Sequence, residues 1–374
     1  MTETTDTNDT DDTNDTAGTT KPPAAASSAP GRPAWLRPAL DRTLVRHLLP
    51  GALALIVLCA VTAALPPFQD LQVANIATYV CAVAGLTVLT GLNGQISLGH
   101  GALMAVGAYG TGLFLTNLAW PLPVALVAGT AVTAAVGALV GTAAARLQGP
   151  YLAGATLTLA VGLPALANYR HLSDLLGGEN GLVVATPPPP AALGAYFPLE
   201  RWQAWICLLC AVVVLVLLAD LGRSRVGRSW RAIRDDEDAA ALAGIPVARL
   251  RVLAFVVSAA CAGLGGGLLA VVSSLAAPGA FPLALSLSLL TGAVLGGLGS
   301  LAGAVYGSIA LVLLPTWTGD VADALHLSRG FYANLPLALF GLVLVLSMLV
   351  FPQGIQGALV RLARRLRAGR RAPS

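Results

Sequence analysis

Residues 222–251 read GRSRVGRSWRAIRDDEDAAALAGIPVARLR and form the most charged stretch between the first and the last apolar segments of the chain. The stretch holds seven arginines and four consecutive acids, Asp235 to Asp238. It lies between two apolar segments, roughly 203–221 and 252–276, each about long enough to cross a bilayer. We therefore interpret it as a structured loop of a membrane protein, and its excess of arginine predicts the cytoplasmic side.

Two short helices are expected in this loop. The first would cover 229–243 and stop at Gly244 and Pro246, because glycine and proline close together end a helix, and the second would run from Val247 onward. Ser229 is the better candidate for its N-cap, since Asp236 would lie too far inside the helix. The loop is either a solvated connector or a docking element, in which an alanine-rich helix face lets a cytoplasmic partner approach closely.

The composition predicts an all-α polytopic membrane protein. The chain is 56% hydrophobic and 11% charged, with a mean hydropathy of +0.75, whereas a soluble domain usually has about 25% charged residues. Apolar runs near 20 residues indicate transmembrane helices, about ten in all. The expected spans are 48–65, 72–90, 101–118, 122–145, 151–168, 203–221, 252–276, 284–297, 302–317 and 332–350.

Charge sets the expected topology. If the N-terminus lies inside, the external segments contain only three basic residues, Arg170, Arg201 and Arg329. This positive-inside bias predicts that both termini are cytoplasmic. We expect a disordered cytoplasmic tail over 1–42, a transmembrane domain over 43–355 that includes the 222–251 loop, and a basic cytoplasmic tail over 356–374. Contact with anionic lipid explains the basic tail, and the net charge of +4 requires no nucleic acid.

The residue inventory argues against several function classes. Lys21 is the single lysine, so the chain cannot form a Walker A loop, and any ATPase must be another chain. No charged residue lies well inside a predicted span, which disfavours a proton- or sodium-coupled carrier. No nucleophile–base pair suggests an enzyme. The Cys207-x-x-Cys210 pair falls in an apolar span and is interpreted as packing, so neither a disulfide nor a metal or cofactor site is expected.

A polar break, GLNGQISLGHG at 91–101, separates two apolar spans. It is either a plain turn with a helix cap or a broken helix whose backbone lines a cavity. Gln95, Ser97 and His100 would supply neutral hydrogen-bonding groups there. The largest expected external segment, 169–202, is either a rigid proline-rich connector or a surface that receives a substrate-delivering protein.

The run from Gly227 to Ile245 resembles the coupling loop of branched-chain amino acid ABC importer permeases. Asp238 stands directly before Ala239, where the general pattern has glutamate. By this resemblance, the segment would sit in a groove of an ATPase. The coupling residues that the resemblance implies are Arg228, Trp230, Arg231, Arg234, Asp235, Asp236, Glu237, Asp238, Ala239, Ala240 and Gly244.

The polar break and the sequence that follows it resemble the G-x-x-G-Q-x-S-L-G-H signature of the same permeases. The segment at 149–158 is also similar to theirs, with Gln148 before Gly149 and the expected arginine displaced to Arg146. Thr156 and Thr158 either face the pathway or bond back to the preceding helical turn. The candidate pathway residues are Asn93, Gln95, Ser97, His100, Tyr109, Thr156 and Thr158.

The resemblance implies a ten-helix permease fold in the cell membrane. It also implies a second permease chain, two ATPase subunits and an external binding protein. The implied substrates are branched-chain amino acids or related small amino acids and amides, moved by alternating access. The alternative is a secondary, ion-coupled transporter of small polar solutes. Selectivity in such importers resides largely in the binding protein, so the residues do not name one substrate.

Overall fold

The computed structural model describes residues 43–146, 150–194, 196–324 and 354–369, with a few single positions between 335 and 346. Within these ranges the chain is almost entirely helical, as the composition predicts, with one two-stranded ribbon. The predicted tail 1–42 and most of the predicted span 332–350 lie outside the described residues.

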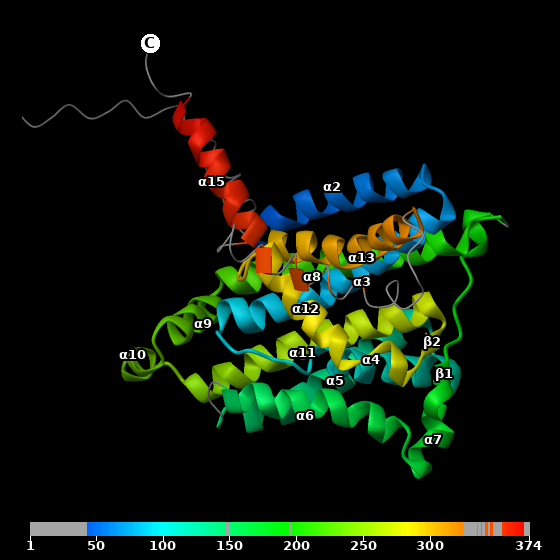
Figure 1. Cartoon of the computed structure of the whole chain (residues 1–374), viewed down its shortest axis with the longest axis horizontal. Coiled ribbons are helices and arrows are strands. Elements are labelled where there is room, and N and C mark those ends of the chain that lie inside the picture. The colour runs from blue at the N-terminus through cyan, green and yellow to red at the C-terminus, as the bar shows by residue number, and fades with distance from the viewer. Residues whose placement is uncertain are drawn as a thin grey trace, which may run out of the picture. The chain divides into compact units, whose positions relative to one another are not determined.

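The helices are labelled in Figure 1. They are α2 (Thr43–Ala63), α3 (Pro67–Leu86), the π-helical turn η2 (Thr87–Leu92), α4 (His100–Thr116), α5 (Leu122–Ala144), α6 (Pro150–Ala167), α7 (Arg170–Leu176), α8 (Leu199–Arg223), α9 (Arg225–Asp235), α10 (Glu237–Leu242), α11 (Val247–Ser273), α12 (Leu283–Gly296), α13 (Leu301–Ala324) and α15 (Gly354–Gly369). Short 3-10 turns cover Gly178–Asn180, Ala191–Leu193 and Pro278–Ala280.

The predicted spans correspond to helices wherever the structure describes them. Within the described ranges, five helical segments are long and apolar enough to cross a membrane, and α6 with α7, bent by 80°, would add a sixth. The apolar parts of α2 and α13 are shorter. The described chain is therefore that of a multi-pass membrane protein. The total of ten spans and the side on which the termini lie remain predictions.

Helix α11 packs against α3, α4 and α5 (Figure 1). A Cβ atom added to Gly107 of α4 would lie 2.1 Å from the carbonyl oxygen of Gly263 in α11. Likewise, a Cβ on Gly296 of α12 would lie 1.9 Å from the carbonyl oxygen of Gly303 in α13. Glycine thus lets these helix backbones touch.

A short antiparallel ribbon joins two loops that are far apart in the sequence. Strand β1 (Leu182–Val183) pairs with β2 (Leu275–Ala276), with Leu182 opposite Ala276. In Figure 1 the ribbon lies at the end of the bundle opposite α9 and α10. The ribbon therefore brings the segment after α7 next to the one after α11.

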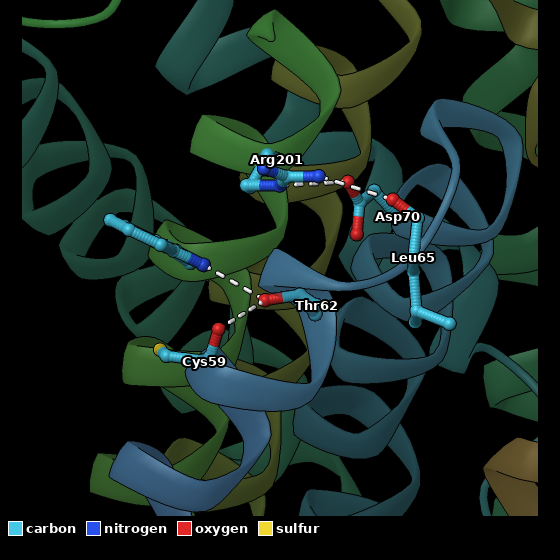
Figure 2. Close-up of polar contacts among 6 residues, drawn as sticks. Cys59, Thr62, Leu65, Asp70 and Arg201 are labelled. Atoms are coloured by element: carbon cyan, nitrogen blue, oxygen red, sulfur yellow. Dashed lines mark hydrogen bonds and ion pairs between the residues drawn. The ribbon is translucent and has the colours of Figure 1, made fainter. Parts of the chain in front are cut away.

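A polar cluster fastens α2 to α3 and α8 (Figure 2). Arg201 of α8 donates from Nε to Asp70 Oδ2 at 3.2 Å and from Nη2 to the carbonyl oxygen of Leu65 at 3.1 Å. Nearby, the Trp205 indole donates to Thr62 Oγ1 at 2.9 Å. These bonds tie the corner between α2 and α3 to the first turns of α8.

The first helix of the charged loop begins earlier than predicted. Helix α9 follows Ser224, whose Oγ accepts a hydrogen bond from the backbone N–H of Gly227 at 3.4 Å. The predicted cap Ser229 lies inside α9, so that prediction was wrong. Ser224 is the N-cap of α9 instead, because its extended backbone separates α9 from the end of α8.

The predicted helix over 229–243 is divided at Asp236, which is extended (φ −158°, ψ 111°). Its Oδ1 accepts from the backbone N–H of Ala239 at 3.0 Å, so Asp236 is the N-cap of α10. The prediction that Asp236 lies too deep to cap a helix was wrong, because one extended residue restarts the helix. The helix stop at Gly244 (φ +81°) and the new start at Val247 are as predicted.

Candidate functional site

The polar break is a buried interruption between two helices. Helix α3 ends in the π-helical turn η2, after which residues 93–99 are irregular and turn back into the bundle before α4 begins (Figure 1). Asn93, Gln95, Ser97 and His100 all have buried side chains. Irregular backbone at membrane depth is tolerated where protein buries it or where it lines a cavity. Gly94 and Ile96 of the same break are exposed, so the turn and the cavity-lining backbone both remain predictions.

Side chains from two other helices hold the C-terminal half of the break. The backbone N–H of Leu98 donates to Thr156 Oγ1 of α6 at 3.0 Å. The N–H of Gly101, in the first turn of α4, donates to Ser286 Oγ of α12 at 2.9 Å. Donors at a helix N-terminus have no partner within their helix, so Ser286 satisfies one of them. The break is therefore fixed between α6 and α12.

The amide side chains of the break leave hydrogen-bonding capacity free. Gln95 Nε2 donates to Asn93 Oδ1. Asn93 Nδ2 and Gln95 Oε1 are buried and have no hydrogen-bond partner in the described part of the chain. A buried polar group without a partner costs free energy. This neutral donor and acceptor are therefore suited to binding water or a small polar solute.

Two other predicted pathway residues, Tyr109 and Thr158, lie away from the break. Tyr109 is nine residues along α4 from His100, which corresponds to about 14 Å of helix. Thr158 is on the exposed face of α6 and lines an open, mostly apolar groove of about 770 Å³ between α5 and α6. Both predicted threonines bond back to the preceding turn, Thr156 to the carbonyl of Ala153 at 3.0 Å and Thr158 to that of Gly154 at 3.1 Å.

The charged loop is fastened to both of its neighbouring helices. Trp230 of α9 is fully buried, and its Nε1 donates to the carbonyl oxygen of Leu250 in α11 at 2.8 Å. Arg231 donates to the carbonyl oxygen of Gly222 in α8 at 3.0 Å. An ion pair between Glu237 of α10 and Arg251 of α11 adds a third connection. A displacement of α9 and α10 would thus be carried into α8 and α11.

The expected alanine-rich face of this loop is largely exposed. Ala239, Ala241 and Ala243 are exposed, whereas Ala240 is buried. The predicted coupling residues that are exposed are Arg228, Arg234, Asp235, Asp236, Asp238, Ala239 and Gly244. Trp230 is buried, and Arg231 and Glu237 are half-buried.

The family model described as the branched-chain amino acid transport system / permease component matches residues 72–351, which include the break and the charged loop. The chain belongs to this permease family. The permease is 30% identical to the high-affinity branched-chain amino acid transport system permease protein LivM of Salmonella typhimurium, over 86% of this chain and 78% of LivM.

Two further relatives show how wide this similarity is. LivH of Escherichia coli, also named as a branched-chain amino acid permease protein, is 29% identical over 75% of the permease and 91% of LivH. The autoinducer 2 import system permease protein LsrC of an Enterobacter species is 29% identical over 76% of the permease and 86% of LsrC. The permease thus resembles importers that are named for chemically different solutes.

Sequence reasoning missed three residues of the permease. Leu242 at the end of α10 is 91% exposed, an apolar side chain in a charged loop. The sequence did contain a signal for Leu242, because it is a large apolar residue that lies outside every predicted transmembrane span. Arg251 and Ser286 carried no local signal, since their contacts join residues 14 and 185 positions apart.

Proposed function

We propose that the permease is the membrane-spanning subunit of an ATP-binding-cassette importer for branched-chain amino acids or related small amino acids and amides. Separate ATPase subunits would drive it through α9 and α10. The observation that carries this proposal is how the charged loop is held. Its outer side is exposed, while Trp230, Arg231 and Arg251 connect it to α8 and α11. The names of LivM and LivH support the substrate class.

In this account Leu242 is the central contact with the ATPase. A leucine that is 91% exposed gains from being covered, whereas an exposed polar side chain gains little. The exposed acids Asp235 and Asp238 belong to the same loop, and charges at a rim favour correct orientation more than affinity. The end of the bundle that carries α9 and α10 would then face the cytoplasm, as the arginines predict.

Transport would proceed by alternating access around the polar break. Closure of the ATPases would push α9 and α10, and the break would alternately open to the two sides of the membrane. Neutral groups such as those of Asn93 and Gln95 would make brief contacts with the solute, which suits a path that must also release it. The end with the β1–β2 ribbon would receive an external binding protein, and a second permease chain would complete the path.

The test is co-purification of an ATPase with the tagged permease from membranes of its native host. Leu242→Asp places a charge at the proposed contact without removing any buried group. Leu193→Asp is the matched control, because Leu193 is an exposed leucine of the predicted external segment 169–202. We expect an ATPase to co-purify with the wild type and the control but not with Leu242→Asp. Purification of every form without an ATPase would refute the proposal.

A further inference from the structure

Arg234, at the C-terminal end of α9, reaches directly to the polar break. Its Nη1 donates to the carbonyl oxygen of Gly91 at 2.6 Å. Its Nε and Nη2 both donate to Asp235 Oδ1, at 3.0 and 2.8 Å. The guanidinium is thus held by an acid of its own helix on one side and bonded to the end of η2 on the other.

The carbonyl of Gly91 needs an outside donor because η2 ends at Leu92. The carbonyls of Val88, Leu89 and Thr90 accept from the backbone N–H groups of the residues that follow η2, at 3.1–3.2 Å. Gly91 comes next, and its acceptor is the one that Arg234 satisfies. A cation at a helix C-terminus also interacts favourably with the helix dipole. Arg234 is therefore a cap that one helix supplies to another.

The contact is tight on both sides of Gly91. A Cβ atom on Gly91 would lie 2.1 Å from the backbone nitrogen of Gly299, in the turn between α12 and α13. A Cβ on Gly94 (φ +80°) would lie 2.9 Å from Cγ of Arg234. The turn at 91–94 is thus enclosed between the Arg234 side chain and the α12–α13 turn, which leaves it little room to move independently of α9.

We propose that Arg234 is the positioning residue that transmits movement of α9 and α10 to the polar break. This inference rests on the proposed function, because it assumes that an ATPase moves these helices. A displaced α9 pulls the capped end of η2 through Gly91. The following residues, 93–99, run without a helix to His100, so the displacement reaches the buried groups of the break directly. Arg234 acts here through a backbone carbonyl and requires no contact with the solute.

The experiment compares Arg234→Ala, Arg234→Lys and Arg225→Ala in the purified complex with its ATPase, reconstituted in liposomes. Arg225 is the exposed first residue of the same helix and is not one of the predicted coupling residues. The measured quantity is leucine taken up per ATP hydrolysed. A merely structural role would lower uptake and hydrolysis together and leave this ratio unchanged.

We expect Arg234→Ala to keep its ATPase and to lower the ratio by about tenfold or more, since a hydrogen bond to a charged group is worth at least about that factor. Arg234→Lys keeps a cation and one donor, so its ratio should be intermediate. Arg225→Ala should match the wild type. A wild-type ratio in Arg234→Ala would overturn the inference, and so would loss of the ATPase from this variant. Loss of the ATPase from Arg234→Ala would overturn only the inference about Arg234, because it would still agree with the proposed function.

Hydrogen exchange gives a second readout that also serves if Arg234→Ala does not fold, because Arg234→Lys can then be compared with the wild type. In the wild-type complex, ATP should change the exchange of backbone amides in residues 87–99. The change should be smaller in the lysine variant, while protection of α10 by the ATPase stays the same. Equal responses to ATP in both forms would overturn the inference.

Discussion

Asp70 of α3 and Arg201 of α8 form an ion pair of 3.2 Å, although the two residues are 131 positions apart in the sequence. The two partners are buried unequally. The Asp70 side chain is completely buried, whereas that of Arg201 is 19% exposed. The carboxylate therefore depends on the arginine, while the arginine can turn toward solvent if the acid is removed. This asymmetry makes the pair testable.

Arg201→Ala should destabilise the permease more than Asp70→Asn does. Removing one partner of a buried pair leaves an uncompensated charge and costs about 3–5 kcal/mol. Asp70→Asn leaves only the partly exposed guanidinium, so its cost should be smaller. The measurement is thermal unfolding in detergent, with Arg170→Ala as the control because Arg170 is an exposed arginine in α7. Equal midpoints for Arg201→Ala and the control would contradict this account of the cluster.

Gly107→Ala should destabilise the bundle, and Gly162→Ala should not. The added methyl at Gly107 would lie 2.1 Å from the Gly263 carbonyl oxygen, whereas nothing lies within 4 Å of one added at Gly162. Overpacking of this kind costs about 1–3 kcal/mol. Both variants replace a helical glycine by alanine, so the difference between their melting temperatures reports the contact between α4 and α11. If Gly107→Ala melts like the wild type, the backbones of α4 and α11 are not in contact.

Trp230→Phe should loosen the charged loop slightly and Trp230→Ala strongly. Phenylalanine keeps most of the buried ring but loses the bond to the Leu250 carbonyl, which costs about 1 kcal/mol. Truncation to alanine costs about 3–5 kcal/mol. Limited trypsin digestion reports the result, because the loop is rich in arginine. The cleavage rate within 222–251 should rise from the wild type through Trp230→Phe to Trp230→Ala, and an unchanged rate in Trp230→Ala would contradict the buried position.

Gln95→Leu should reduce leucine uptake, whereas Thr158→Val should leave it near the wild-type rate. Gln95 is a buried amide with a free acceptor in the polar break, but Thr158 bonds back to its own helix on an exposed face. Initial uptake rates by cells with equal amounts of each form in the membrane provide the comparison. The pathway would have to be relocated to the α5–α6 groove if Thr158→Val were the defective variant.

Much of the helical frame could be predicted from hydropathy and helix-stop residues. Helix α5 occupies Leu122–Ala144 where 122–145 was expected, and α11 begins at Val247 because Gly244 and Pro246 end the helix before it. Helix boundaries set by such residues are local, so the sequence reveals them. The broken segment was visible for the same reason, since polar residues and glycines interrupt two apolar spans.

Contacts between distant residues could not be predicted. Asp236 is of a residue type that caps helices, but no glycine or proline near it indicates that the helix expected over 229–243 is divided there. The two-residue strands β1 and β2 are too short to have a periodic pattern. Arg234 was a predicted coupling residue, but its bond to Gly91 joins positions 143 apart. Such contacts depend on how helices pack, which one sequence does not specify.

The energy source of leucine uptake shows most directly whether ATP drives the permease. Uptake would be measured in native cells and in cells that lack the permease, first with a protonophore that collapses ion gradients while ATP is maintained, then with arsenate, which depletes ATP while the gradients persist. We expect permease-dependent uptake to survive the protonophore and to stop with arsenate. Uptake that stops with the protonophore and continues with arsenate would contradict it and would favour an ion-coupled carrier.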